Sequence, residues 1–155
     1  RKHRDISSEI ESLIDEIKAE DRIIVIKKHP LMELSMEESK GVIIDKFFST
    51  EEMLYIADYV ISDYSAIVFE AALLEKRMCF FAFDLDEYKA SRSFYLDYES
   101  DMPGDICRTA YEVETALRDS HFDVDAVRSF AHSYVEKTDY VTKELADIVL
   151  MKKMS

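Results

Sequence analysis

Two short stretches of the sequence carry side chains suited to binding a phosphate group. The first, Lys27–Pro30 (KKHP), places a histidine beside cations, and a histidine next to a phosphate can donate a hydrogen bond or a proton at neutral pH. The second, Asp63–Ala66 (DYSA), carries Ser65 at the expected start of a helix, where a hydroxyl and free backbone N–H groups together attract anions. If both stretches face one anion, the pair is a more specific signal than either stretch alone.

Glu70 and Asp63 are further candidates for the same site, and each candidate residue also has a simpler explanation. Glu70 lies about one and a half turns into the same expected helix, where it would accept hydrogen bonds from ribose hydroxyls if phosphates bind at the helix start. Asp63 is suited to shape its loop or to contact a ligand hydroxyl, because a carboxylate repels phosphate. Alternatively, Ser65 only caps its helix, Glu70 only faces water and His29 is an ordinary surface histidine at a strand end. The residue pattern alone leaves both explanations open.

Alternating strands and helices are expected to position these residues. Short β-branched or apolar runs predict strands, and longer runs with apolar residues at helical spacing predict helices. The expected strands are Arg22–Lys28, Gly41–Asp45, Tyr59–Asp63, Met78–Phe83 and Ile106–Arg108, and the expected helices are Ser7–Glu20, Ser49–Ala57, Ser65–Glu75, Ala110–Asp119, Val124–Lys137 and Val141–Met151. Capping boxes are expected at Ser8/Glu11 and Ser49/Glu52, whereas Asp84–Gly104 has no clear period.

Strands joined by helix-length connections predict an α/β fold, a Rossmann-like parallel sheet with helices on both faces. In such doubly wound sheets, ligands bind beyond the carboxyl ends of the strands. Lys27–Pro30 follows the first expected strand and Asp63–Ala66 follows the third. Both stretches are therefore expected to face the same crevice.

Length and composition narrow the class of protein. The chain has 155 residues with 20 basic and 33 acidic side chains, a net charge of −13, and is expected to form a single domain over residues 1–155. Its acidity disfavours nucleic acid as a partner. Gly41 and Gly104 are its only glycines, which excludes glycine-rich dinucleotide and P-loop motifs. Cys79 and Cys107 lie in apolar runs, as reduced core cysteines of a cytosolic protein do. No apolar run reaches membrane-helix length, and Arg1 as the first residue suggests an N-terminal truncation.

Several motifs, in order and at fitting spacings from Ile23 to Thr109, resemble the glycerophosphotransferases that use CDP-glycerol to build teichoic-acid-like polymers in bacteria. They are IKKHPL at Ile26–Leu31, ADYVISDYSAIVFE at Ala57–Glu70, FAFDLDEY at Phe81–Tyr88, RSFYLDY at Arg92–Tyr98 and the pair Pro103-Gly104. The resemblance implies a two-domain glycosyltransferase-B architecture, of which this chain is the C-terminal, nucleotide-binding half.

The resemblance also implies a reaction. A terminal glycerol hydroxyl of the polymer attacks the β-phosphorus of CDP-glycerol and releases CMP, in a site that acts by positioning and charge stabilisation. Carried over by motif, His29 is the catalytic residue and Ser65 and Arg92 bind the donor, and the chemistry of the neighbouring residues adds Lys28, Asp63, Ala66 and Glu70 to the donor-binding set. No metal and no other cofactor is implied. The base that activates the acceptor is a histidine of the preceding domain, so this chain alone is expected to bind nucleotide weakly and to catalyse nothing.

The implied partners are CDP-glycerol or a related CDP-polyol donor and a polyol-phosphate polymer acceptor. The implied location is the cytoplasmic side, peripheral at the inner face of the bacterial plasma membrane, with membrane contact through the missing N-terminal part. The motifs depart from the family at Ala66, which replaces a second serine, at Arg77-Met78 in place of Lys-Pro, at Ser93 in place of glycine and at Asp139-Tyr140 in place of Asp-Gly. The donor polyol, glycerol or ribitol, therefore stays open.

Three other interpretations fit parts of the sequence. Asp84-Leu85-Asp86 has the DxD form of a divalent-cation site in metal-dependent glycosyltransferases, although the family segment does not imply a metal. Asp63 at a strand end resembles the phospho-acceptor of a receiver signalling module, but the first strand ends on basic residues instead of the acidic pair that would bind magnesium. A CMP-sugar transferase of the sialyltransferase type also pairs a His-Pro motif with a serine motif.

Overall fold

The structure, a computed structural model, describes residues 6–19, 21–27, 38–91, 96–119, 121–135 and 141–153. The strands are β1 (Ile24–Lys27), β2 (Val42–Asp45), β3 (Tyr59–Ser62), β4 (Arg77–Phe81) and β5 (Asp105–Cys107). The helices are α1 (Ser7–Ile17), α2 (Thr50–Ile56), α3 (Ile67–Leu73), α4 (Leu85–Ser91), α5 (Tyr98–Asp101), α6 (Ala110–Arg118), α7 (Val124–Tyr134) and α8 (Val141–Lys153). Every predicted strand and helix is therefore present, mostly with shorter ends.

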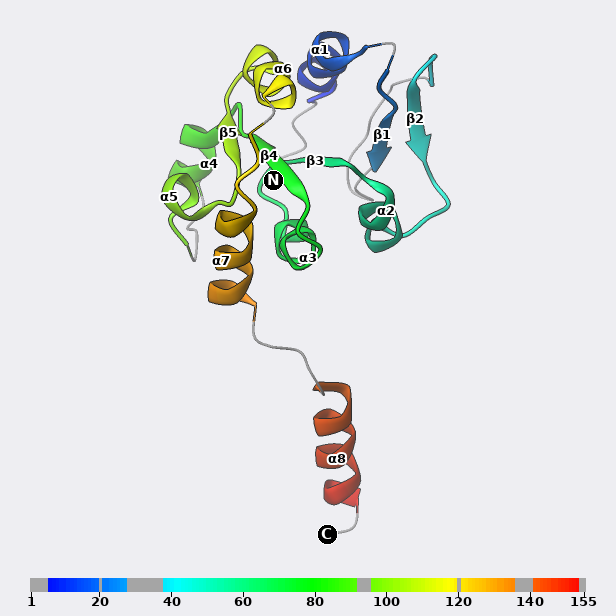
Figure 1. Ribbon diagram of the computed structural model, residues 1–155, viewed down its shortest axis with the longest axis vertical. Coiled ribbons are helices and arrows are strands. Elements are labelled where there is room, and N and C mark those ends of the chain that lie inside the picture. The colour runs from blue at the N-terminus through cyan, green and yellow to red at the C-terminus, as the bar shows by residue number, and fades with distance from the viewer. Residues whose placement is uncertain are drawn as a thin grey trace.

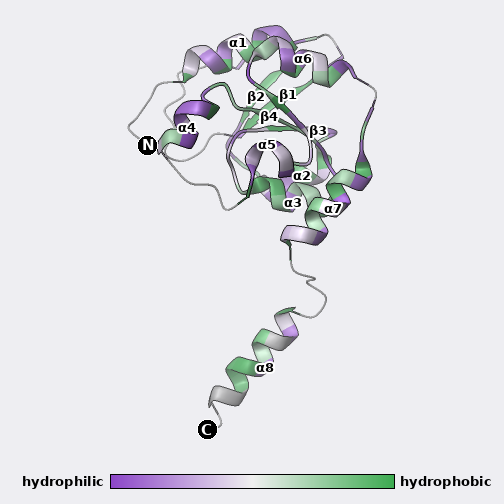
Figure 2. Cartoon of the chain, turned by 90° about the vertical axis from the view of Figure 1, so that its left-hand side faces the viewer, coloured by the Kyte–Doolittle hydropathy of each residue, from purple (hydrophilic) through white to green (hydrophobic). Residues whose placement is uncertain are grey.

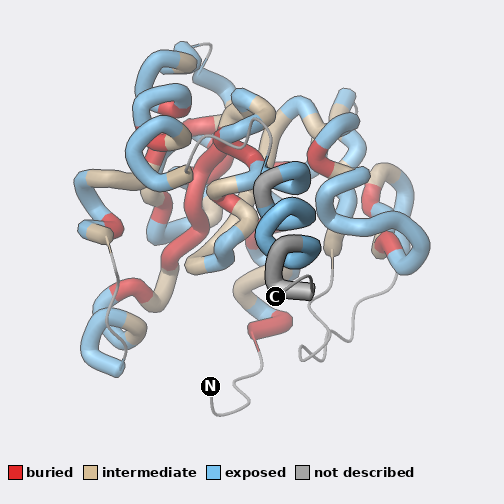
Figure 3. Tube along the Cα trace, turned by 90° about the horizontal axis from the view of Figure 1, so that it is seen from below, coloured by how far each residue is buried: buried red, intermediate tan, exposed pale blue. Residues whose placement is uncertain are grey.

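All strand pairs are parallel, as the sequence predicts, and helices lie on both faces (Figure 1). Alternation along β4 assigns its side chains to two faces, because successive residues of a strand point to opposite sides. Met78 and Phe80 pack with α3 and α7, whereas Cys79 and Phe81 pack with α1 and α6. Figure 3 shows the buried residues gathered along the centre of the domain between these layers. The predicted α/β fold class is confirmed.

The sheet is not continuous across the described residues. Strand order is β1–β2 in one group and β3–β4–β5 in the other, so the described ladder hydrogen bonds do not join β1 to β3. The pairing Val25↔Ile43 lies in the first group and Ile61↔Cys79 in the second. The carboxyl ends of β3, β4 and β5 share one edge because the three strands are parallel neighbours.

Two capping predictions have different outcomes. At α2 the Ser49 hydroxyl accepts from the Glu52 N–H at 3.1 Å and the Glu52 carboxylate accepts from the Ser49 N–H at 2.7 Å, so the predicted capping box is confirmed. At α1 the predicted box is wrong, because the N-cap is Ile6, two residues before Ser8, and it makes no side-chain cap hydrogen bond. Ser8 instead donates to the carboxylate of its neighbour Glu9 at 2.7 Å.

The remaining differences concern the second half of the chain. The stretch predicted to lack a period, Asp84–Gly104, contains the short helices α4 and α5. Helix α8 extends away from the domain with hydrophobic residues along it (Figure 2), and Leu145 and Ile148 are more than half exposed. Cys79 and Cys107 are both free and buried, as predicted. Among the helices described, none has the length and apolar character that crossing a membrane requires.

Candidate nucleotide-binding site

The loop Asp63–Ala66 lies at the carboxyl end of β3 and leads into α3. The helix begins at Ile67 with Ala66 as its N-cap, so the prediction that Ser65 is the N-cap is wrong. The Ser65 hydroxyl lies one residue earlier and accepts a long hydrogen bond, 3.4 Å, from the Ile67 N–H. Ala66 has helical backbone angles and its carbonyl accepts from the Phe69 N–H at 3.1 Å, so the first turn starts at Ala66 and Ser65 lies in the preceding loop.

This loop presents its polar groups to solvent. Ser65, Ala66 and Glu70 are exposed, and Asp63 is half-buried. Because α3 has only seven residues, the hydroxyl and the loop amides are a stronger feature for an anion than the helix dipole is. The structure thus brings Asp63, Ser65, Ala66 and Glu70 together on one loop and the first turns of its helix.

The carboxyl end of β1 is anchored by an ion pair. Lys27 donates to the buried carboxylate of Asp45 at 2.6 Å and also to the Phe48 carbonyl. The hydrogen bond from Lys27 holds the pKa of Asp45 below its usual value, with help from the Phe47 and Phe48 N–H groups. Lys27 therefore ties β1 to the loop after β2, and its charge is already paired within the protein.

Three predicted site residues lie outside the described part of the chain. These are Lys28 and His29, which follow β1, and Arg92, which follows α4. That Lys27–Pro30 and the loop Asp63–Ala66, here called the serine loop, bind one anion together stays a prediction.

Tyrosine side chains that the sequence analysis did not single out tie the serine loop to neighbouring segments. The Tyr98 hydroxyl donates to the Asp63 carbonyl at 3.0 Å, and the Tyr64 hydroxyl donates to the Asp84 carboxylate at 2.8 Å. The Tyr64 ring stacks on Tyr88 with centroids 3.8 Å apart. The sequence signal for these contacts was the presence of Tyr88 and Tyr98 in the motifs after β4. The sequence analysis used those motifs only for the family resemblance.

The acidic pair of the DxD form is bound to protein groups. Asp84 accepts from Tyr64, and Asp86 accepts from Arg108 at 3.0 Å. Arg108 also contacts Glu99 at 3.2 Å. In the described part of the chain no group of three or more histidine, cysteine or acidic side chains is arranged to hold a metal ion.

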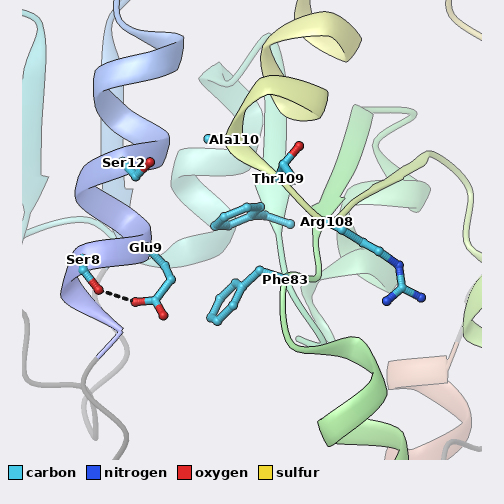
Figure 4. Close-up of a pocket in the computed structure, with 8 residues that line it drawn as sticks. Ser8, Glu9, Ser12, Phe83, Arg108, Thr109 and Ala110 are labelled. Carbon is cyan, nitrogen blue, oxygen red and sulfur yellow. Dashed lines mark hydrogen bonds between the residues drawn. The ribbon is translucent and has the colours of Figure 1, made fainter.

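An open pocket of about 380 Å³ lies at the same sheet edge, between α1 and the ends of β4 and β5 (Figure 4). The rings of Phe81 and Phe83, with centroids 5.2 Å apart, form part of its wall, and Ser12 and Thr109 contribute hydroxyls. Figure 4 shows the Arg108 side chain turned away from the pocket. None of the described residues predicted for donor binding lines this pocket. The rule that ligands bind beyond the carboxyl ends of strands also predicts a pocket after β4 and β5, where this one lies.

The serine loop lies within a region of the chain that matches a known protein family. Residues 2–149 match the family described as CDP-Glycerol:Poly(glycerophosphate) glycerophosphotransferase. The chain is 31% identical over 122 residues to the teichoic acid ribitol-phosphate polymerase TarL of Staphylococcus aureus, covering 76% of this chain and 22% of that protein. It is 29% identical over 140 residues to a teichoic acid poly(glycerol phosphate) polymerase of Staphylococcus epidermidis, covering 87% of this chain and 18% of the relative.

The fold also matches solved structures. A variant of the wall teichoic acid polymerase TagF soaked with CDPG superposes with a TM-score of 0.74 at 23% identity, covering 98% of this chain and 40% of that one. The unsubstituted TagF structure gives a TM-score of 0.71 and covers 96% of this chain. The chain spans less than a quarter of the length of the polymerases TarL and the Staphylococcus epidermidis relative, and two fifths of the solved TagF chain.

Proposed function

The chain belongs to the CDP-glycerol:poly(glycerophosphate) glycerophosphotransferase family, and we propose that it supplies the donor-binding half of an enzyme that transfers glycerol phosphate from CDP-glycerol to a teichoic-acid-like acceptor. The observation that carries the proposal is the exposed Ser65 hydroxyl on a loop at the carboxyl end of β3, inside the matched region. Ligands of open parallel sheets bind at this edge. Family membership favours a transferase over a receiver module.

The proposed roles divide between binding and stabilising charge. Ser65 and the Ala66 N–H hold donor phosphate oxygens, Glu70 accepts from ribose hydroxyls, and Asp63 shapes the loop. Lys28 and Arg92 add positive charge near the pyrophosphate. His29 is the catalytic residue, since a histidine that donates to the bridging oxygen stabilises the charge that builds up there.

The proposed reaction is a phosphoryl-type displacement. The terminal hydroxyl oxygen of the acceptor forms a bond to the β-phosphorus of CDP-glycerol, and the bond from that phosphorus to the bridging oxygen breaks. CMP leaves with the electron pair, and the proton of the acceptor hydroxyl passes to a base in a part of the enzyme outside this chain. We place the reaction at the cytoplasmic face of the bacterial membrane, with contact to the membrane made outside this chain.

A calorimetric titration of the full-length protein with CDP-glycerol, CDP-ribitol, CMP and CMP-sialic acid tests the proposal. We expect selective binding of a CDP-polyol, weakened about tenfold by Ser65→Ala and by His29→Ala, because a hydrogen bond to a charged group contributes about 1.5 kcal/mol. Ser129→Ala and His132→Ala, at exposed positions of α7, are the matched controls.

The outcomes separate the alternatives. Wild-type affinity in both Ser65→Ala and His29→Ala would show that these residues do not bind the donor and that the proposed site is wrong. Selective binding of CMP-sialic acid over the CDP-polyols would favour the sialyltransferase type of activity instead. Preference for CDP-ribitol would leave the proposed type of transfer unchanged and show that the donor carries ribitol instead of glycerol.

A further inference from the structure

The three tyrosines Tyr64, Tyr88 and Tyr98, here called the tyrosine cluster, come from separate segments and meet at the serine loop, of which Tyr64 is part. Tyr64 belongs to the loop after β3, Tyr88 to α4 and Tyr98 to α5. The Tyr64 ring lies 3.8 Å from Tyr88 in a stacked arrangement and 5.3 Å from Tyr98 in a tilted one, measured between centroids. Segments up to 35 residues apart in the sequence therefore converge on one short loop.

Tyr98 is the most deeply placed member of the cluster. Its side chain is 3% exposed and packs edge-on against Phe80 of β4. Its hydroxyl reaches the Asp63 carbonyl at 3.0 Å. A buried tyrosine whose hydroxyl meets a backbone carbonyl both packs the core and fixes the path of the chain at that carbonyl.

Tyr64 holds the other side of the loop. Its hydroxyl donates to the Asp84 carboxylate at 2.8 Å, which links the loop after β3 to the start of α4. Burial, and then the bond to Asp84, raise the pKa of Tyr64 well above its usual value, and burial does the same for the pKa of Tyr98. Both hydroxyls consequently remain protonated donors throughout the physiological range.

The second half of the loop makes hydrogen bonds to the first turn of α3. The Ile67 N–H reaches the Ser65 hydroxyl at only 3.4 Å, and the Phe69 N–H reaches the Ala66 carbonyl at 3.1 Å. Ser65 and Ala66 themselves are exposed. A loop placed in advance of binding loses less conformational entropy when the ligand arrives, so ties at its base contribute to affinity.

We propose that Tyr98 and Tyr64 are positioning residues of the donor site, which set the Asp63 carbonyl and the loop backbone so that Ser65 meets the donor phosphate. The proposal rests on the proposed function, because it assigns a role to residues that act through Ser65. It extends the site to two tyrosine side chains that act on the loop through hydrogen bonds to the Asp63 carbonyl and the Asp84 carboxylate.

The test compares phenylalanine variants of the full-length protein. Tyr98→Phe and Tyr64→Phe remove one hydroxyl each and keep the ring packing, and we expect each to weaken CDP-glycerol binding about fivefold, the effect of one ordinary hydrogen bond. Tyr134→Phe is the matched control, since Tyr134 donates to the Asp101 carboxylate at 2.7 Å, as Tyr64 does to Asp84, and this bond ties α7 to α5 instead of to the loop. Asp84→Asn keeps an acceptor for Tyr64 and is expected to bind near wild-type affinity.

Two readouts separate positioning from general stability. Hydrogen exchange of the amides from Tyr64 to Ile67 should accelerate in Tyr98→Phe and Tyr64→Phe and stay unchanged in Tyr134→Phe. In a Ser65→Ala background the Tyr98→Phe change should weaken binding by less than about twofold, because the group it positions is gone.

The possible failures are distinguishable. If the Tyr98→Phe and Ser65→Ala effects multiply fully, Tyr98 acts on stability and the positioning role is wrong. If Tyr98→Phe leaves both exchange and affinity unchanged while Ser65→Ala weakens binding, the positioning role is again wrong and the donor site stands. If exchange accelerates but neither Tyr98→Phe nor Ser65→Ala changes affinity, the loop is held as described and the proposed donor site is wrong.

Discussion

Strand β4 at the centre of one strand group and strand β1 of the other are both mainly apolar in sequence, but they differ in burial. In β4 (RMCFF) four of the five residues are buried, whereas in β1 (IVIK) none is. Val25 and its partner Ile43 on β2 have 36% and 47% of their surface exposed. Apolar runs thus occur in both groups, but the buried environment of a parallel strand is concentrated in β4, since β3 has no fully buried residue and β2 buries only Val42 and Asp45.

The difference follows from the helices that cover each group. Helices α1 and α6 pack on one face of β4 and β5, and α3 and α7 cover the other face. The β1–β2 pair carries exposed apolar residues, and beyond its end Phe47 is 91% exposed. An apolar run therefore predicts a capacity for burial, whereas helices over both faces determine whether the strand is buried.

The largest expected effect is in the centre of the buried group. Phe80 of β4 is fully buried, so Phe80→Ala should lower the free energy of unfolding of the 155-residue chain by about 4 kcal/mol, the usual cost of removing a buried aromatic ring. The half-exposed Ile43→Ala should cost about 1 kcal/mol or less. Urea unfolding followed by circular dichroism measures both, and equal costs would break the contrast between the strand groups.

The two glycines give the next prediction, one glycine for each region. An added Cβ at Gly104 would lie 2.3 Å from the Met78 carbonyl oxygen of β4, so the backbone must move and Gly104→Ala should cost about 3 kcal/mol. Gly41, before β2, has φ +82° and more space, so Gly41→Ala should cost about 1 kcal/mol through backbone strain. Gly41→Asn should recover part of that loss, because asparagine tolerates positive φ. A Gly104→Ala variant as stable as Gly41→Ala would show that β5 is not held against β4.

The fold was largely predictable because its elements carry local signals. The run MCFFAF and the Ser49/Glu52 box contain the periodicity and capping chemistry that place β4 and α2. The missing strand pairing between β1 and β3 was not predictable, because strand pairing depends on contacts between residues far apart in the sequence. In the candidate site, the serine loop followed from its position after a strand. The contact between Tyr98 and Asp63 joins residues 35 apart and leaves no local pattern.

An acid titration compares ion pairs in the two regions. Glu114 of α6 is buried and accepts from Arg22 and Arg118, and although burial by itself raises the pKa of Glu114, these arginines hold that pKa below its ordinary value of 4.5. A group whose pKa is lower in the folded state stabilises the fold above its unfolded pKa, and this contribution is lost as the pH falls through the folded value. The stabilisation by Glu114 is therefore complete at pH 7 and declines below about pH 4.5.

Glu114→Gln should lower the free energy of unfolding by about 1.5 kcal/mol at pH 7, the cost of a lost hydrogen bond to a charged group, and by progressively less toward pH 3. Urea unfolding at several pH values checks this, with the exposed Glu11→Gln of α1 as control. A difference between wild type and Glu114→Gln that stays constant from pH 7 to pH 3 would show that the glutamine disturbs packing instead of removing a charge.

Asp45, paired with Lys27 in the β1–β2 region, has its pKa lowered in the same direction, so Asp45→Asn should loosen the loop at Phe48 in hydrogen exchange.

The smallest effect tests the exposed face directly. Valine and threonine have nearly the same shape, so Val→Thr measures whether a position tolerates a hydroxyl. Val25 is 36% exposed, and Val25→Thr should change the free energy of unfolding by less than about 0.5 kcal/mol, as surface substitutions do. Val113 of α6 is fully buried, and Val113→Thr should cost about 2 kcal/mol, because a hydroxyl is transferred into an apolar core. If Val25→Thr proves as costly as Val113→Thr, the β1–β2 face is covered in solution, and the two strand groups differ in what covers them instead of in burial itself.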